Sequence, residues 1–190
     1  MITGISDNAV RFCVGEGHPS ETEPRCRITV FQCLPKTGKM ELIVQKCTEL
    51  GAHAVVPVVS ARCVVQPTGN FEIKRVRYQK VAEEAAKQSR RGMVPLFGTI
   101  TPIEALDPSA FDLFLIAYEE ERTLTLRTLL RRKWAVKQAG VLIGPEGGLT
   151  PEEVAMLADR GGAPVSLGAR ILRTETAGMT VLAQMLYELE

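Results

Sequence analysis

The sequence predicts an α/β protein in which a mainly parallel sheet is flanked by helices. Short runs of strand-forming residues alternate with helical patterns along the chain. Several of these runs are nearly continuous in apolar residues, as expected for strands that are covered on both faces. A chain of 190 residues that is 45% hydrophobic is also long enough to bury one substantial core.

The predicted strands are short segments bounded by turn-forming residues. They are expected at residues 27–34, 54–59, 112–118, 140–143 and 164–167. Because helical patterns separate them, successive strands should run in the same direction. The residues before the first strand are rich in turn formers; they offer a strand or two, for example over 9–14, but no self-sufficient domain.

Three helices are expected between these strands. The first has apolar residues at three- and four-residue spacing, and Gly51 can end it in a left-handed conformation. The second is expected over 72–91, which is rich in Glu, Ala, Lys and Gln. The third begins at 150–153, where a capping hydroxyl, a proline and two acids follow one another. The apolar faces are Met40, Ile43, Cys47 and Leu50 in the first helix, and Ile73, Val76 and Val81 in the second.

The last helix, predicted over 176–190, is apolar around most of its circumference. Its apolar residues are Ala177, Met179, Val181, Leu182, Ala183, Met185, Leu186 and Leu189. A helix of this kind must be buried on most sides. Either a single core covers it, or it also forms a subunit interface; we favour the interface, and therefore a homodimer.

Composition excludes several classes of protein. No apolar run approaches the roughly 20 residues of a membrane span, and the first residues lack the pattern of a secretion signal, so we expect a soluble, cytoplasmic protein. The five cysteines form no Cys-x-x-Cys pair, and His18 and His53 stand in no ligand spacing, so no metal site is expected. The net charge of +1 gives no overall indication of nucleic-acid binding, and the local basic cluster at 74–91 could equally be a solvated helix face.

Two glycine-containing segments each join a predicted strand to a predicted helix. The first, 142–150, reads Leu-Ile-Gly-Pro-Glu-Gly-Gly-Leu-Thr; it has neither the Gly-Lys-Ser/Thr of a phosphate-binding loop nor the Gly-x-Gly-x-x-Gly spacing. The second, 166–177, carries two arginines and a glutamate between capping threonines. Ligands bind beyond the carboxyl ends of parallel strands, so the two segments can form one pocket, although each alone could be an ordinary turn.

Together these segments resemble the RsmE family of SPOUT methyltransferases, which methylate ring nitrogen 3 of a uridine in small-subunit ribosomal RNA. The similarity covers about residues 28–190. Its motifs lie at 39–51, 84–95, 143–153 and 167–177. Arg90 departs from the small residue expected at its position.

The resemblance implies a C-terminal deep trefoil knot, which general folding rules would count against. It also implies a homodimer through the C-terminal helix. Residues 28–190 would then be the SPOUT methyltransferase domain. Family members usually carry an N-terminal β-barrel of the PUA type, and residues 1–27 would be a short remnant of it.

The resemblance further implies S-adenosyl-L-methionine (SAM) as cofactor, held mostly by backbone groups. The expected cofactor contacts are Gly144, Glu146, Gly147, Gly148, Leu167, Gly168, Ile171, Leu172 and Ala177. Methylating a uracil nitrogen requires that its proton leave and that negative charge on the ring carbonyls be stabilised. We therefore expect Arg173 to be the cation, and Glu175 to remove the proton or to orient Arg173. The alternative is an internal Arg173–Glu175 pair that only fixes the knot.

The implied partner is ribosomal RNA or the small ribosomal subunit. The expected phosphate contacts are Lys36, Lys39, Arg62, Lys87 and Arg91. Three other functions stay open: a SPOUT methyltransferase that acts on another RNA or atom, such as a ribose hydroxyl; a non-catalytic RNA-binding or ribosome-assembly factor; and a nucleotide hydrolase, which the missing phosphate-loop lysine disfavours.

Overall fold

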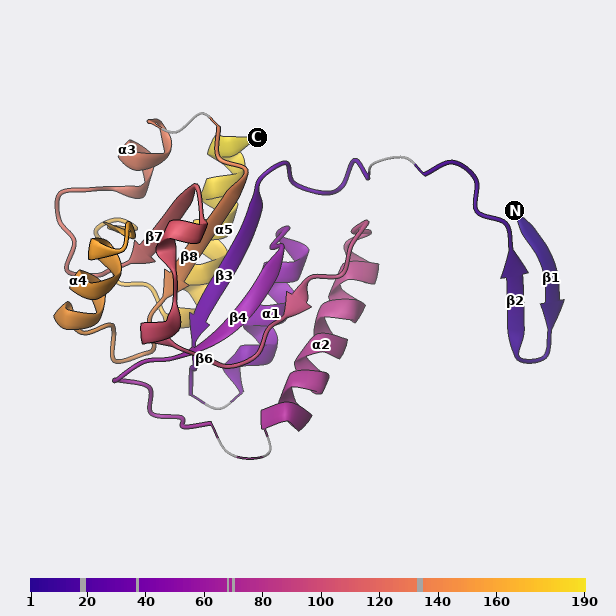
Figure 1. Cartoon of the computed structure of the whole chain (residues 1–190), viewed down its shortest axis with the longest axis horizontal. Coiled ribbons are helices and arrows are strands. Elements are labelled where there is room, and N and C mark those ends of the chain that lie inside the picture. Colours follow the sequence, from indigo (N-terminus) through magenta and orange to yellow (C-terminus); the bar gives the residue numbers. More distant parts are fainter. Residues whose placement is uncertain (18–19, 37, 68, 70, 133–134) are drawn as a thin grey trace.

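A parallel sheet forms the centre of the molecule, as predicted. The computed structural model describes the chain except for residues 18–19, 37, 68, 70 and 133–134. Its main sheet has the strand order β5-β4-β3-β8-β7-β9, with β6 beside β4, and every pairing is parallel (Figure 1). The strands are β3 (Arg27–Cys33), β4 (Ala54–Val59), β5 (Leu96–Phe97), β6 (Thr101–Pro102), β7 (Leu113–Ala117), β8 (Gln138–Ile143) and β9 (Ala163–Val165).

The five strands that the sequence predicts for this sheet are all present. β4 has the predicted bounds, and the ends of the other four differ by up to two residues. β5 and β6 were not predicted, because a two-residue strand has no periodicity to detect. β3, β8 and β7 lie in the middle of the sheet, and their side chains are almost all buried, which explains their continuous apolar composition.

Helices cover the sheet and extend beyond both of its ends. Figure 1 shows α3 and α4 at the end near β7, and α2 at the opposite end. α1 packs against both α2 and α5. The helices are α1 (Lys39–Glu49), α2 (Phe71–Gln88), α3 (Leu126–Leu130), α4 (Pro151–Asp159) and α5 (Thr174–Leu189), with 3-10 turns at Ile103–Ala105 and Pro108–Ala110.

The local signals for helix ends are confirmed. Gly51 follows α1 with a φ of 101°, a left-handed conformation that suits glycine. At the start of α4, Thr150 Oγ1 accepts from the backbone N–H of Glu153 at 3.2 Å, while Glu153 Oε2 accepts from the backbone N–H of Thr150 at 2.8 Å. This reciprocal capping box fixes where the first glycine segment ends.

The predicted apolar face of α2 is wrong at Ile73 and Val76, whereas the third predicted residue, Val81, is partly buried and packs against the core. Ile73 and Val76 are 72% and 52% exposed. The buried residues of α2 are Ala82, Ala85 and Ala86 instead. Small side chains let α2 approach α1 closely, so this helix is packed by its alanines rather than by its larger apolar residues.

α5 begins at Thr174, two residues before its predicted start. Its buried residues include Val181, Leu182 and Met185, which pack among α1, β3 and β8. One core thus covers much of the apolar stripe, while Tyr187 stays 86% exposed. The homodimer and the trefoil knot stay predictions.

The first residues form a separate hairpin. β1 (Ile2–Ser6) and β2 (Ala9–Phe12) pair antiparallel, and Figure 1 shows them apart from the main sheet. Nearly all of the hairpin is exposed. The assignment of residues 1–27 to a PUA-like remnant stays a prediction.

Neither a membrane-spanning helix nor a metal cluster occurs among the residues that the structure describes, which leave out His18. None of their helices is long and apolar enough to cross a membrane. They contain no group of three or more His, Cys, Asp or Glu side chains that could hold a metal. All five cysteines are free thiols, and all except Cys13 are buried.

Candidate functional site

A pocket of about 330 Å³ lies beyond the carboxyl ends of three neighbouring strands, β7, β8 and β9. Both glycine segments line it, as the sequence predicts. Lys39, at the start of α1, also belongs to its wall. The lining residues come from 117–119 and Arg122, from 143–146 and Gly148, and from 166–174 and Ala177.

The first glycine segment is held by the loop that follows β4. Arg62 Nη1 donates to the carbonyl oxygens of Gly147 at 3.1 Å and Leu149 at 3.2 Å. Glu153 Oε1 accepts from the backbone N–H of Ala61 at 2.7 Å. Gly148 has a φ of 71°, and a Cβ there would collide with the carboxylate of Glu119. The segment is therefore fixed in a conformation that needs glycine.

A buried hydrogen-bond chain joins the two glycine segments. Thr174 Oγ1, at the start of α5, donates to the carbonyl oxygen of Gly144 at 2.7 Å. The same hydroxyl accepts from Gln32 Nε2 at 2.8 Å. Gln32 is completely buried at the end of β3. The floor of the pocket is thus tied to the middle of the sheet.

Most of the predicted cofactor contacts line this pocket. Gly147 is the exception, because it packs against the side chain of Arg62 instead. A Cβ added to Gly147 would lie 3.2 Å from the Cβ of Arg62. The predicted contacts that do line the pocket are Gly144, Glu146, Gly148, Leu167, Gly168, Ile171, Leu172 and Ala177. Of these, Ile171 leaves 86% of its surface exposed, which is unusual for a large apolar side chain.

Sequence reasoning missed the contribution of β7. Ala117, the last residue of β7, lines the pocket together with Tyr118 and Glu119, and Arg122 lies just beyond them. The strand itself was predicted at 112–118, so its exit at the same sheet edge was the available signal. The segment contains no glycine to draw attention to it.

Lys39 lies in the pocket wall and is already paired with carboxylates, and its role as an RNA contact stays a prediction. Its ammonium Nζ lies 3.0 Å from Glu146 Oε1 and 3.0 Å from Glu175 Oε2. Glu146 also accepts from the backbone N–H of Lys36 at 3.0 Å. Lys39 therefore bridges one carboxylate from each glycine segment at the pocket wall.

This bridge changes the acidity of all three groups. The Glu175 and Glu146 carboxylates beside it raise the pKa of Lys39. Burial alone would raise the pKa of Glu175, but its own backbone N–H, the Lys39 ammonium and nearby Arg173 together hold that pKa below its ordinary value. Burial alone would also raise the pKa of Glu146. Its own backbone N–H and the Lys39 ammonium outweigh burial, so this pKa too lies below its ordinary value. All three groups are thus charged at neutral pH.

Arg173 lies at the pocket and keeps its guanidinium available. It is exposed, and it precedes the first residue of α5. Among the described residues, its guanidinium makes no hydrogen bond or ion pair that meets the usual distance limits. The internal Arg173–Glu175 pair considered above is not formed, because Glu175 pairs with Lys39 instead.

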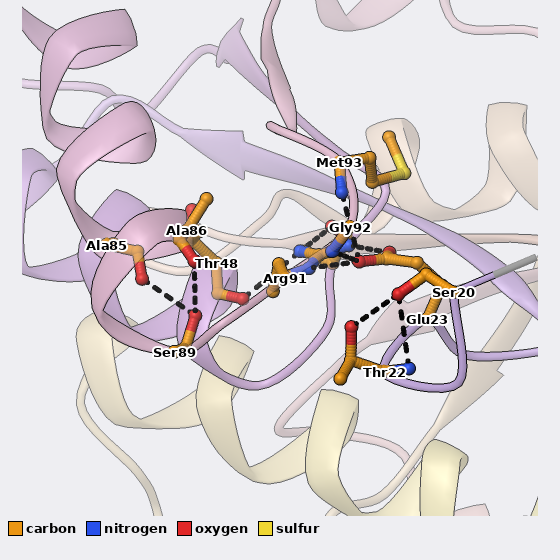
Figure 2. A network of polar contacts seen from close by, with 11 residues as sticks. Ser20, Thr22, Glu23, Thr48, Ala85, Ala86, Ser89, Arg91, Gly92 and Met93 are labelled. Atoms are coloured by element: carbon orange, nitrogen blue, oxygen red, sulfur yellow. Dashed lines mark hydrogen bonds and ion pairs between the residues drawn. The ribbon is translucent and has the colours of Figure 1, made fainter. Parts of the chain in front are cut away.

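Arg91 is buried, which corrects its assignment as an RNA contact. Its side chain is only 3% exposed. Figure 2 shows its guanidinium enclosed by Glu23 and by the end of α1. Arg91 Nη2 donates to Glu23 Oε2 at 2.6 Å, and Nη1 donates to the carbonyl oxygens of Thr48 at 3.1 Å and Ala52 at 2.6 Å. A guanidinium that is buried and bonded in this way is not placed to meet a phosphate.

The other predicted RNA contacts stay predictions. Lys36 is exposed. Lys87 is also exposed, and it pairs with Glu84 at 2.8 Å within α2. Arg62 braces the glycine segment as described, from an exposed position.

The fold and the pocket define a class of RNA methyltransferase domain. A sequence profile of that domain matches residues 21–186. The chain is also 35% identical over 196 residues to a ribosomal RNA small subunit methyltransferase E of Bacillus subtilis, covering all of this chain and 77% of that protein. It is therefore a member of the ribosomal RNA small subunit methyltransferase E family.

Other relatives agree with this assignment. The chain is 36% identical over 164 residues to the enzyme of the same name from Mycobacterium bovis, which covers 82% of this chain and 61% of that protein, less than two thirds of its length. A crystal structure of the Neisseria gonorrhoeae enzyme, bound to S-adenosyl methionine, superposes with a TM-score of 0.79 and 32% identity, over 88% of this chain and 68% of that one.

Proposed function

We propose that this chain methylates small-subunit ribosomal RNA at ring nitrogen 3 of a uridine, with SAM as methyl donor. The observation that carries the proposal is the pocket itself, where two glycine segments meet at adjoining strand exits and present the unpaired Arg173. The family relatives named for this activity support it. The chain spans 77% of the length of the Bacillus subtilis relative and 61% of that of the Mycobacterium bovis relative.

The pocket fits the proposed cofactor in size and composition. About 330 Å³ lies in the range of small-molecule sites. Gly168, with a φ of 120°, would direct a Cβ into open space, so the backbone there is open to a ligand. The exposed side chain of Ile171 gives an apolar surface that a bound adenine or ribose would cover.

SAM supplies an activated methyl group on a sulfonium sulfur, and the chain supplies position and charge. In the transfer, a bond forms between N3 and the methyl carbon while the carbon–sulfur bond breaks, and the N3 proton leaves to a base. Arg173 is placed to stabilise the negative charge that the uracil carbonyl oxygens carry after the proton leaves.

Glu175 has two candidate roles, and its surroundings favour one of them. A carboxylate with a lowered pKa is a weak proton acceptor, which disfavours Glu175 as the base. Its ion pair with Lys39 favours a role in arranging the charges around Arg173. In this proposal, the proton leaves to solvent or to an RNA group.

The partners follow from the reaction. The substrate is ribosomal RNA or the assembled small subunit, and the enzyme works in the cytoplasm as a homodimer through α5. The exposed tip of α5 at Tyr187 supports an interface there. Lys36, Arg62 and Lys87 are the proposed phosphate contacts.

The test combines cofactor binding with analysis of the modified nucleoside. The purified chain should bind SAM in calorimetry and transfer label from methyl-labelled SAM to small ribosomal subunits. Mass spectrometry of the digested RNA should then show 3-methyluridine. A methylated ribose would instead support a SPOUT enzyme with another target atom. Absence of SAM binding would favour a non-catalytic RNA-binding factor and end the proposal.

A further inference from the structure

We propose that Lys39 is a positioning residue that keeps Arg173 unpaired by holding the carboxylate of Glu175. The inference rests on the proposed function, because it concerns the residue to which that function assigns charge stabilisation. It concerns one juxtaposition at the pocket wall, where the start of α1 meets the start of α5.

Glu175 has a buried oxygen that depends on Lys39. Glu175 Oε2 is buried, and among the described residues no group other than Lys39 bonds to it. The Lys39 ammonium, 3.0 Å away, is the positive charge that balances it. The Glu175 side chain is 16% exposed, but its buried oxygen cannot be solvated fully, so this oxygen would attract another cation if Lys39 were absent.

Arg173 is the cation that would replace Lys39. It lies two residues before Glu175 in sequence, and its charge already contributes to the lowered pKa of Glu175. An Arg–carboxylate pair is favoured by the planar fork of the guanidinium. Such a pair would neutralise Arg173 and turn it away from a substrate. Lys39 prevents the Arg173–Glu175 pair because its own ammonium is paired with the Glu175 carboxylate.

The second contact of Lys39 fixes where its ammonium lies. Glu146 Oε1 is 3.0 Å from Lys39 Nζ, and Glu146 is itself held by the backbone N–H of Lys36. The ammonium is therefore anchored from the first glycine segment while it binds Glu175 in the second. The two segments are also held by other bonds, such as that of Thr174 to Gly144, so the part of Lys39 that matters here is its competition with Arg173.

The test is a double-substitution series in the full chain: Lys39→Met, Glu175→Gln and both together. K39M should lower kcat at least ~10-fold while the KM for SAM changes less than about threefold, because Arg173 is captured and the cofactor contacts remain. Adding E175Q removes the captor, so K39M/E175Q should turn over within about threefold of E175Q alone. If the double variant is as slow as K39M, Lys39 acts directly on substrate and the proposal is wrong.

Two controls keep the result interpretable. Lys46→Met removes another ammonium of α1, one that pairs with Glu49 on the helix surface at 2.8 Å, and should leave kcat unchanged. Lys39→Arg keeps a cation beside Glu175 and should restore at least part of the turnover that K39M loses. Thermal unfolding of each variant shows whether it is folded at the assay temperature.

A structural measurement decides the inference without any activity. In a crystal structure of K39M, the Arg173 guanidinium should lie within about 4 Å of the Glu175 carboxylate, the usual limit of an ion pair. Arg173 still pointing away from Glu175 would overturn the proposal. If the unsubstituted chain methylates no RNA, the proposed function fails, and the crystal structure still tests the contact between these two side chains.

Discussion

Arg91 and Arg173 each lie near a glutamate, in two regions of the molecule that differ in burial and in partners. The side chain of Arg91, three residues after α2, is 3% exposed and donates to Glu23 and to two backbone carbonyls. Arg173, at the pocket, is exposed, and the glutamate nearest to it in sequence pairs with Lys39 instead. The first arginine is fully used by the fold, whereas the second is kept available.

The comparison teaches that charge in a sequence does not reveal whether a residue has spare bonding capacity. A buried guanidinium must bond its donors within the protein, so removing it lowers the free energy of unfolding. An exposed guanidinium at a pocket is solvated until a ligand binds, so removing it lowers turnover rather than stability. Substitutions in the two regions should therefore separate stability from turnover.

The largest expected effect is on stability, at Arg91. Arg91→Ala leaves the carboxylate of Glu23 and the carbonyl oxygens of Thr48 and Ala52 without their donor. Removing one partner of a buried pair costs about 3–5 kcal/mol. We expect a loss of this size in the free energy of unfolding, measured by urea denaturation, with SAM affinity of the folded protein little changed.

The matched control is Arg75→Ala, which removes a guanidinium from α2, the helix that precedes Arg91. Arg75 pairs with Glu72 at 2.7 Å on the surface, where Glu72 is 67% exposed. Such a pair is worth about 0–1 kcal/mol. If R75A and R91A destabilise equally, burial does not distinguish the two arginines and the comparison is broken.

The next largest effect is on turnover, at Arg173. Arg173→Ala removes the charge proposed to stabilise the transition state, while the backbone contacts of the pocket remain. We expect kcat to fall about 100-fold, which corresponds to about 2.7 kcal/mol, with SAM affinity nearly unchanged. Steady-state kinetics and calorimetry measure the two quantities.

Arg127→Ala is the control for Arg173, because Arg127 is exposed on α3 and does not line the pocket. It should leave both quantities unchanged. Equal losses of SAM affinity and turnover in R173A would mean that Arg173 supports the shape of the pocket rather than the reaction.

Features that depend on neighbours in sequence were predictable. The capping box of Thr150 and Glu153 and the left-handed Gly51 are both set within a few residues, so the sequence alone located them. The buried strands β3, β4, β7 and β8 were equally readable from their composition. The two glycine segments were assigned to one pocket because both follow strands that end at one edge of the sheet.

Features that depend on distant contacts were not predictable from the residues. Lys39 and Arg91 were both taken as phosphate contacts, yet one meets carboxylates more than 100 residues away and the other meets Glu23 across the fold. The buried side of α2 was missed for the same reason, since only the proximity of α1 makes its alanines the contact face. Basic composition could not distinguish these cases.

The third prediction sharpens the Arg91 region through pH. Burial alone would raise the pKa of Glu23, but Arg91 and the backbone N–H groups of Met93 and Gly92 hold it below the ordinary value of 4.5. A carboxyl whose pKa is lowered by folding stabilises the folded state at pH values above its unfolded-state pKa. This stabilisation is lost as the pH falls through the pKa of the folded state. Glu23 should therefore stabilise the protein at neutral pH and not in acid.

Glu23→Gln is the variant that tests this pH dependence. At pH 7 it should lose about 2 kcal/mol, the value of a hydrogen bond to a charged group. The difference from the unsubstituted chain should shrink as the pH falls below 4.5. Urea denaturation at pH 7 and at acid pH measures it. A difference that is the same at both pH values would show that the charge of Glu23 contributes nothing.

The smallest effect concerns the residue next to Arg91. Arg90 has a φ of 58°, and it is the only described residue other than glycine with a positive φ. A left-handed conformation costs an L-residue about 1–2 kcal/mol, whereas glycine loses about 0.5–1 kcal/mol more than other residues in chain entropy. This explains why a small residue is expected here.

Arg90→Gly should therefore raise the free energy of unfolding by about 0.5 kcal/mol, seen as a higher urea midpoint. Arg90→Ala removes the same exposed side chain but keeps the strained backbone, so its midpoint should stay unchanged. If the two variants have equal midpoints, the strain at Arg90 is negligible. If only R90G gains stability, the backbone at Arg90 is strained. The ion pair between Arg91 and Glu23 then stabilises the fold despite this strain.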